Sequence, residues 1–263
     1  MNIRSHLAAA AMAAAALLPA AAHADKLQDI MNSGTIRVGI LLDVPPWGML
    51  DDQGQPAGLD VEVAELLAHE LSVDLEIVQV TGTNRIPNLL SDQVDILIAA
   101  MGANSERAQQ VMFSQPYTVV DLGVYGSPEI GLSDDPAVLS GHTISVARGT
   151  TLDLWLTDNA PDDATIARFE DVPAAMAAYI AGQSDMFAEN SAIIANLRLD
   201  RPDIEIAPVV IMRQSPAHVG VPMGEHNLLQ WVNTFVFSNI INENLPALQE
   251  KWFGTERGML PAI

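Results

Sequence analysis

Short β-branched strands alternate with helical patterns along this chain, and the alternation occurs twice. The first series predicts strands at 35–40, 75–80 and 94–100, with helices at 59–71 and 86–90. The second series predicts strands at 142–147, 165–169 and 185–188, with helices at 152–156, 172–180 and 192–197. Alternation of this kind is typical of parallel strands joined by crossover helices. The chain is therefore predicted to form two α/β domains.

Two further strand-like runs connect the series. The run at 117–125 joins the first series to the second, and the run at 217–221 leads into helical patterns at 228–241 and 245–252. If these last helices pack against the first domain, the chain crosses between the domains twice. Two crossings form a hinge, and the space between the domains becomes the natural ligand site. The predicted domains are 25–121 together with 217–263, and 122–216.

The first 24 residues read as a secretory signal. Arg4 precedes an Ala- and Leu-rich run at 7–18, and Ala22-His23-Ala24 places small residues where a signal peptidase cleaves. The apolar run is shorter than the roughly 20 residues that span a bilayer. Since the chain has no cysteine that could carry a lipid, we expect the exported product to be free in the periplasm.

The composition excludes several other functions. The chain has 33 acidic residues against 12 Lys and Arg, a formal charge of −21, which argues against nucleic acid and anionic membranes as partners. Without cysteine there is no disulfide framework, thiolate metal site or cysteine nucleophile. The six histidines show no ligand-type spacing, and no hydrolase, phosphate-loop or dinucleotide motif occurs. We therefore expect no metal and no cofactor.

The run from Gly58 to Ala68, GLDVEVAELLA, resembles the signature of the family 3 periplasmic solute-binding proteins. Further matching motifs follow one another in the order that this family has: Pro45-Pro46-Trp47, Asn84-Arg85-Ile86-Pro87, Val94-Asp95, Ser105-Glu106-Arg107, Phe113-Ser114-Gln115-Pro116-Tyr117, Gly149-Thr150-Thr151, 182–185 and Lys251-Trp252-Phe253-Gly254. The resemblance implies the type II periplasmic-binding fold, with two α/β domains joined by a two-strand hinge. It also implies a monomer that delivers its ligand to the membrane permease of an ABC importer.

The resemblance also implies which residues hold a ligand carboxylate. Arg107 matches the family's arginine, whose planar guanidinium can grip a carboxylate with two hydrogen bonds. Gly102 and Asn104 lie on the same turn, where backbone N–H groups favour an anion. The family commonly has a hydroxyl at the position of Gly102, so this contact is expected to come from the backbone alone.

On the second domain, Thr150 and Thr151 follow a glycine and lead into a helix. By resemblance they close over the same carboxylate, although Thr150 can equally be a plain helix cap. Trp47 follows two prolines and matches an aromatic residue that contacts ligand in relatives, with a core tryptophan as the alternative.

The pocket for the ligand side chain looks mixed. Arg85 resembles the arginine that faces the ligand in receptors for acidic amino acids. Those receptors carry a further arginine at the position of Leu41, and receptors for cationic amino acids often have Asp there. With Leu41, Leu42 and Trp47 apolar and Arg85 cationic, the ligand side chain stays open.

The largest departure from the family lies where relatives present an Asp to the ligand ammonium, because that position holds Asn190. Glu189 is adjacent, but neighbouring residues on a strand point to opposite faces. Three alternatives follow: a bulge turns Glu189 inward, another acid serves, or the ligand has a carboxylate and no primary ammonium.

We therefore expect a receptor without enzyme activity that captures an amino acid or similar small carboxylate by hinge closure. The alternative is an enzyme on the same fold, a dehydratase acting on a cyclic carboxylate, with Glu189 as general acid.

Overall fold

The computed structural model describes residues 25–254. The predicted signal at 1–24 therefore lies outside the described residues. Among the described helices, none combines the length and apolarity that crossing a membrane requires.

The first lobe is built around three parallel strands in the order β4-β1-β5. Its elements are α2 (Lys26–Ser33), β1 (Thr35–Ile40), the small pair β2 (Met49–Leu50) and β3 (Pro56–Ala57), α3 (Leu59–Leu71), β4 (Asp74–Gln79), α4 (Arg85–Leu90), β5 (Ile96–Leu97) and the 3₁₀ turn η2 (Arg107–Gln109). Strand β1 is central and carries three fully buried residues, Ile36, Val38 and Ile40. Its inward residues pack under α3, whose Leu59, Val63 and Leu67 are buried at helical spacing.

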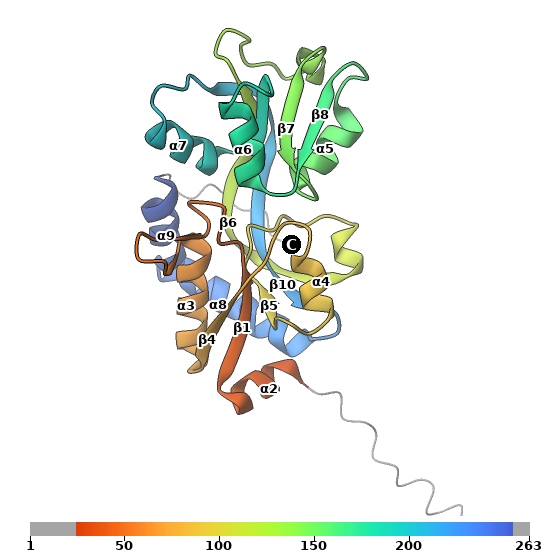
Figure 1. Ribbon diagram of the computed structural model, residues 1–263. Coiled ribbons are helices and arrows are strands. Elements are labelled where there is room, and N and C mark those ends of the chain that lie inside the picture. The colour runs from red at the N-terminus through yellow and green to blue at the C-terminus, as the bar shows by residue number, and fades with distance from the viewer. Residues whose placement is uncertain (1–24, 255–263) are drawn as a thin grey trace, which may run out of the picture.

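The second lobe repeats the arrangement with parallel strands in the order β9-β7-β8. Its elements are the 3₁₀ turn η3 (Pro136–Leu139), β7 (Thr143–Ala147), α5 (Thr151–Asn159), β8 (Thr165–Phe169), α6 (Val172–Ile180), β9 (Met186–Asn190) and α7 (Ser191–Asp200). Figure 1 shows these elements grouped at one end of the molecule. The two predicted series of parallel strands and crossover helices are confirmed, with strand bounds shifted by a few residues.

Two long strands connect the lobes. Strands β6 (Val111–Gly126) and β10 (Ala207–Pro222) pair antiparallel along nearly their whole length and stand at the middle of one eight-stranded sheet. Near one end β10 pairs with β5, and near the other β6 pairs with β9. Figure 1 shows both strands running from one group of elements to the other. The sequence predicted only 117–125 of β6 and 217–221 of β10, so it missed the first part of each long strand.

The last two helices return to the first lobe. Helix α8 (His226–Ile241) packs on β6 and α2, and α9 (Asn244–Phe253) packs on α3. The chain therefore crosses between the lobes twice, as the sequence predicted. The domain limits at 121/122 and 216/217 fall inside the long strands, and they stay a prediction.

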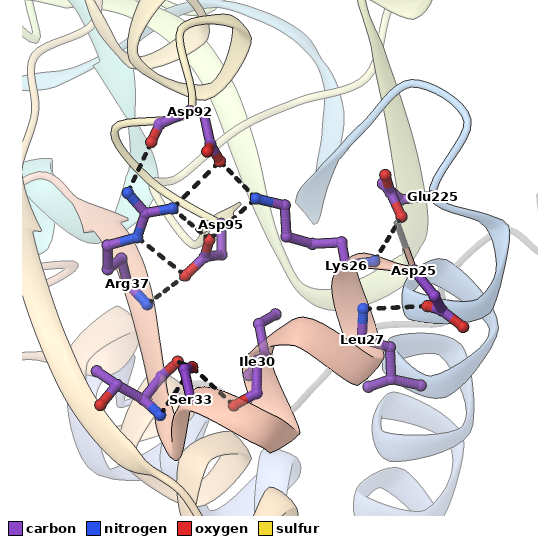
Figure 2. Close-up of polar contacts among 10 residues, drawn as sticks. Asp25, Lys26, Leu27, Ile30, Ser33, Arg37, Asp92, Asp95 and Glu225 are labelled. Atoms are coloured by element: carbon purple, nitrogen blue, oxygen red, sulfur yellow. Dashed lines mark hydrogen bonds and ion pairs between the residues drawn. The ribbon is translucent and has the colours of Figure 1, made fainter. Parts of the chain in front are cut away.

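An ion-pair cluster fixes the N-terminal helix to the bottom of the first lobe (Figure 2). The carboxylate of Asp95 accepts hydrogen bonds from the backbone N–H of Arg37 at 2.8 Å and from its Nη2 at 2.6 Å. Lys26, on α2, pairs with Asp92 and reaches Asp95 at 3.4 Å. The side chain of Asp95 is 6% exposed, whereas that of Asp92 is 69% exposed. Asp95 is therefore the member of the cluster whose loss costs most.

We predict that Asp95→Asn lowers the free energy of unfolding by about 2 kcal/mol, because a buried, multiply bonded carboxylate loses its charge and part of its hydrogen bonding. Asp92→Asn is the matched control and should cost under about 1 kcal/mol, since exposed ion pairs contribute little. Urea unfolding of both variants measures the difference. Equal losses in the two variants would contradict the assignment of Asp95 as the buried anchor.

Candidate ligand-binding site

A cavity lies between the two lobes, and it encloses about 730 Å³ of empty space when the part open to solvent is included. The first lobe lines it from the loop after β1, from α4 and from the segment after β5; the second lobe lines it from the starts of its helices. Residues of β6 and β10 form its back, including Val120, Leu122, Ser215 and Ala217. Any ligand in this cavity therefore contacts both lobes and the strands that join them.

Three helices of the second lobe begin at the cavity. Thr150, Asp171 and Asn190 cap α5, α6 and α7, and each accepts a hydrogen bond from a backbone N–H of the first helical turn. All three caps line the cavity. They come together because parallel strands β7, β8 and β9 end at the same edge of the sheet, where each chain turns into its helix. This edge presents helix N-termini, which favour negative charge, to the ligand space.

Arg107 links the lobes beside the cavity. Its Nη1 donates to the carbonyl of Gly102 at 2.8 Å and to Oγ1 of Thr151 at 3.2 Å, and its Nη2 donates to the carbonyl of Gly149 at 2.9 Å. Gly102 and Thr151 line the cavity, whereas Arg107 itself does not. Burial lowers the pKa of this guanidinium. The Nε–H and one Nη2 hydrogen carry no hydrogen bond to another described residue, so the guanidinium retains donors for an anion.

Asn104 and Gly102 have different surroundings. The side chain of Asn104 accepts from the backbone N–H of Arg107 at 2.8 Å and does not line the cavity, so it orients Arg107. A Cβ at Gly102 would lie 3.2 Å from the hydroxyl oxygens of both Ser215 and Thr151. Position 102 itself has no hydroxyl, and the hydroxyls of Ser215 on β10 and Thr151 on α5 lie next to it.

Arg85 lines the cavity and is 4% exposed. Its Nη1 donates to the carbonyl of Ala99 at 2.6 Å, and burial followed by the nearby Arg107 lowers its pKa to about 9. Beneath it, Asp60 is fully buried and accepts from the hydroxyl of Tyr117 at 2.7 Å and from the backbone N–H of Ala100 at 2.9 Å. Burial raises the pKa of Asp60 to about 7.

Trp47 and Leu41 are among the apolar residues of the wall. Trp47 is 1% exposed, and its ring centroid lies 4.8 Å from that of Phe253 with the planes 61° apart. The structure therefore places Trp47 both in the core and in the wall of the cavity, so the two alternatives from the sequence do not exclude one another.

Glu189 and Asn190 both line the cavity and both are buried. Oε1 of Glu189 accepts from the backbone N–H and from Nδ2 of Asn190, each at 3.1 Å. Oδ1 of Asn190 accepts from the N–H groups of Ala192 and Ile193. No bulge interrupts the pairing of β6 with β9 at these residues. The alternation of side chains along a strand predicts that Glu189 and Asn190 point to opposite faces. Both line the cavity because Asn190 is the last residue of β9 and its side chain turns back to cap α7.

Burial raises the pKa of Glu189 to about 7, although its bonds with Asn190 and the charge of Arg85 act in the opposite direction. The charge of Glu189 also helps to raise the pKa of Tyr125, after burial and the charge of Asp121. Glu189 therefore exchanges its proton near neutral pH, as an acid held in a poorly solvated place does.

Three buried polar atoms in the wall have no hydrogen-bond partner: Oδ1 of Asp43, Nε1 of Trp47 and Nε of Arg85. Such atoms are rare in native proteins because each costs free energy. Among the described residues only two others share this condition, and neither lines the cavity. The unsatisfied hydrogen-bonding capacity is therefore concentrated where a ligand would lie.

Sequence reasoning missed Asp43, Glu170, Asp171 and Ser215 as residues of the wall. Asp171 carried a readable signal, since it precedes Val172-Pro173 at the start of a predicted helix, as a cap does. Asp43 and Ser215 had none, because a loop and a hinge strand bring them to the cavity. Among the described residues no group of three or more His, Asp or Glu is placed to hold a metal ion.

The model of the bacterial extracellular solute-binding proteins, family 3, matches residues 36–255. The chain belongs to this family. Its two-lobed architecture with a cavity over two connecting strands is the type II periplasmic-binding fold predicted from the sequence.

Two relatives illustrate the likeness of this solute-binding protein to others. The L-cystine-binding protein TcyJ of Escherichia coli is 27% identical over 237 residues, which covers 88% of this chain and 86% of TcyJ. A solved structure of a solute receptor for L-cysteine from Neisseria gonorrhoeae matches with a TM-score of 0.79 and 28% identity, over 86% of this chain and 92% of that one.

An enzyme is also similar to part of this solute-binding protein. The cyclohexadienyl dehydratase of Pseudomonas aeruginosa is 34% identical over 110 residues, or 41% of each chain. The match to a binding protein is thus much longer than the match to the enzyme.

We predict that the free energy of unfolding of the ligand-free protein falls as the pH rises, and that Glu189 contributes to this fall. Its pKa is about 7 in the folded protein against 4.5 in the unfolded chain, so between these values the folded state holds a proton that the unfolded state releases. Raising the pH through this window therefore lowers the free energy of unfolding, by about 2 kcal/mol from pH 5.5 to 7.

Glu189→Gln should show a smaller decline, because glutamine stays neutral and keeps an acceptor for Asn190, while the buried Asp60, whose pKa is also raised to about 7, keeps its own contribution. Denaturant unfolding of both proteins at several pH values measures it, with the exposed Glu65→Gln as control. The same pH dependence in wild type and Glu189→Gln would contradict a raised pKa at this position.

Proposed function

We propose that this protein is a periplasmic receptor that captures an amino acid by closure of its two lobes and delivers it to the permease of an ABC importer. The observation that carries the proposal is the cavity between the lobes, whose wall contains the unpartnered atoms of Asp43, Trp47 and Arg85. The names of the relatives support it, since TcyJ binds cystine and the Neisseria receptor binds cysteine.

The ligand carboxylate lies, in this proposal, at the start of α5. The first N–H groups of a helix have no partner inside the helix, and Thr150 and Thr151 line the cavity at this place. Arg107 supplies charge from the first lobe while bonding Thr151 and Gly149 of the second. Arg85 offers its unpartnered Nε from the opposite wall. A carboxylate there joins donors of both lobes.

The ligand ammonium pairs with Glu189 rather than with Asn190. Asn190 uses its oxygen on α7 and its amide group on Glu189, so it positions the carboxylate and has no charge to offer. Glu189 is buried in the wall and bears the charge. Of the three alternatives left open by the sequence, we choose the one in which Glu189 faces the ligand. It does so here without a bulge in the strand.

Closure follows from contacts that exist only when the lobes meet. The lobes are joined by β6 and β10, and the ligand touches groups from both sides. A ligand shifts the protein toward the closed form only if it binds that form more tightly. Thr150 and Thr151 from one lobe and Arg107 from the other supply this difference.

We further propose that residues 1–24 direct export and are removed after Ala24, which leaves an untethered monomer in the periplasm. No cofactor takes part in capture. The charge of −21 keeps nucleic acid from being a partner.

A second candidate function is a dehydratase on a cyclic carboxylate. It is favoured by Glu189, whose pKa near 7 in a cavity is that of a general acid, and by the partial likeness to the cyclohexadienyl dehydratase. Incubation with prephenate and detection of the aromatic product tests it. Turnover that disappears in Glu189→Gln would replace the receptor assignment with an enzyme.

Isothermal titration calorimetry against the common amino acids and small carboxylates tests the receptor. We predict that Arg107→Ala weakens the best ligand at least about 100-fold, because a desolvated carboxylate loses its charged partner. Arg201→Ala is the control, since Arg201 pairs with Asp203 in an exposed turn. Retained affinity in Arg107→Ala would refute the carboxylate assignment, and no binding of any compound would refute the receptor.

We also predict that Glu189→Gln weakens an α-amino acid by about 100-fold and Asn190→Asp by about tenfold at pH 7.5. The aspartate keeps the cap on α7 but places a second carboxylate beside Glu189, which makes ionisation of Glu189 harder. For the wild type, affinity should fall as the pH drops below 7, because the ammonium requires Glu189 ionised. Tighter binding by Asn190→Asp would show that position 190 itself holds the ammonium.

A further inference from the structure

One end of the cavity is acidic, and both lobes contribute to it. Asp43 follows β1 in the first lobe, whereas Glu170 and Asp171 lie between β8 and α6 in the second. All three line the cavity. None of these carboxylates forms an ion pair with a described residue. The cavity thus carries more negative charge than the pairing of one ammonium requires.

Asp43 and Asp171 line the same cavity from different lobes. Burial and then the charge of Asp171 raise the pKa of Asp43. Oδ1 of Asp43 is buried without a partner, while Oδ1 of Asp171 accepts from the N–H of Ala174 and leaves its other oxygen for a further contact. Two like charges brought together from separate lobes make closure costly unless a cation lies between them.

The same cavity contains two deeply buried side chains whose donor atoms lack partners, Trp47 at Nε1 and Arg85 at Nε. These donors call for acceptors on a ligand, and they are independent of the acidic residues. The cavity is therefore built to hold a molecule, and the question is only what charge that molecule bears.

We propose that the ligand carries a second cationic group besides its α-ammonium, and that Asp43 and Asp171 receive this group from the two lobes. The ligand class is an amino acid with an ammonium, amidine or guanidinium group on its side chain. The inference rests on the proposed function, since it names the ligand of the same receptor site.

The charges of the wall favour such a ligand, because acidic side chains outnumber basic ones. The lining residues include four acids (Asp43, Glu170, Asp171 and Glu189) and two arginines (Arg85 and Arg148). Arg148 is exposed and donates to the carbonyl of Arg168 at 3.4 Å within its own lobe, so it does not neutralise Asp43. A ligand with one net positive charge complements this excess of acid.

The charge of the whole chain acts in the same direction. A formal charge of −21 attracts a net cation toward the cavity over long range and does nothing comparable for a neutral zwitterion. Salt screens that attraction. The rate of association therefore provides a test that does not depend on contacts in the cavity.

The experiment compares a cationic ligand with a neutral one of closely similar shape, and the arginine and citrulline pair is nearly isosteric. L-Arginine is paired with L-citrulline, and L-lysine with L-norleucine, each titrated calorimetrically into the full-length mature protein. We expect the cationic member of at least one pair to bind about 10- to 100-fold more tightly than its neutral partner. Its association rate should fall as salt rises from about 20 to 200 mM, whereas that of the neutral partner should not.

The variants are Asp43→Asn and Asp171→Asn, and asparagine at 171 can still cap α6. Each should reduce the ratio between the cationic and the neutral ligand at least about fivefold, because the cationic ligand loses an ion pair that the neutral one does not make. Asp74→Asn, at an exposed position of β4, is the control and should leave the ratio unchanged. Two variants in different lobes keep the test decisive if one of them fails to fold.

The outcomes distinguish failure of the second cationic group from failure of the proposed receptor function. If both members of each pair bind equally, or if the ratio survives both variants, the second cation is refuted and the amino-acid receptor stands. If neither pair binds but a neutral or acidic amino acid does, the inference also fails. If no amino acid binds at all, the proposed function itself fails.

Discussion

Strands β6 and β10 are the only described connection between the lobes, and the rest of the structure depends on this constraint. Because the connection is just two strands wide, few backbone hydrogen bonds oppose a rotation of one lobe against the other. The relative position of the lobes is then decided by what lies between them. Arg107 shows this clearly, since a single guanidinium bonds Gly102 on one side and Gly149 and Thr151 on the other. Groups that would be ordinary core residues in a single-lobed protein become determinants of closure here.

The cavity holds charge at a cost to the folded protein. Arg85, Asp60 and Glu189 are all buried. Burial lowers the pKa of Arg85 and raises the pKa of Asp60 and of Glu189, so it favours the neutral form of each. Only Asp60 is well supplied with donors, from Tyr117 and Ala100. A core without such groups would be more stable. These buried charged groups lower the stability of the ligand-free protein. A ligand that pairs with them removes this cost, and the free energy regained contributes to binding.

The sequence predicted much of the fold and less of the site, for a physical reason. Periodicity is local, so β1, α3, β8 and α6 were predicted with nearly the observed bounds. The long strands were underestimated because polar residues and a proline, such as Arg213-Gln214-Ser215-Pro216 of β10, interrupt their apolar runs. Site residues such as Arg85 and Thr151 were predicted from their motifs, and both line the cavity. The position of Glu189 was not, since alternation along a strand fails where its last residue turns to cap a helix. Asp43 and Asp171 were also missed, because distant segments of the chain bring them to one cavity.

Glu189 connects the receptor with the enzyme to which part of the chain is similar. A carboxyl group with a pKa near 7 has no fixed role, because its charge depends on its partner. An ammonium placed beside it favours the ionised form, lowers its pKa and makes it a binding group. A ligand without an ammonium leaves it protonated, and the same group can then donate its proton to a leaving hydroxyl. The charge of the ligand therefore decides whether this carboxyl group acts as an anion or as an acid. Asn190 contributes to both, since its hydrogen bonds hold the carboxyl in place whether or not it carries a proton.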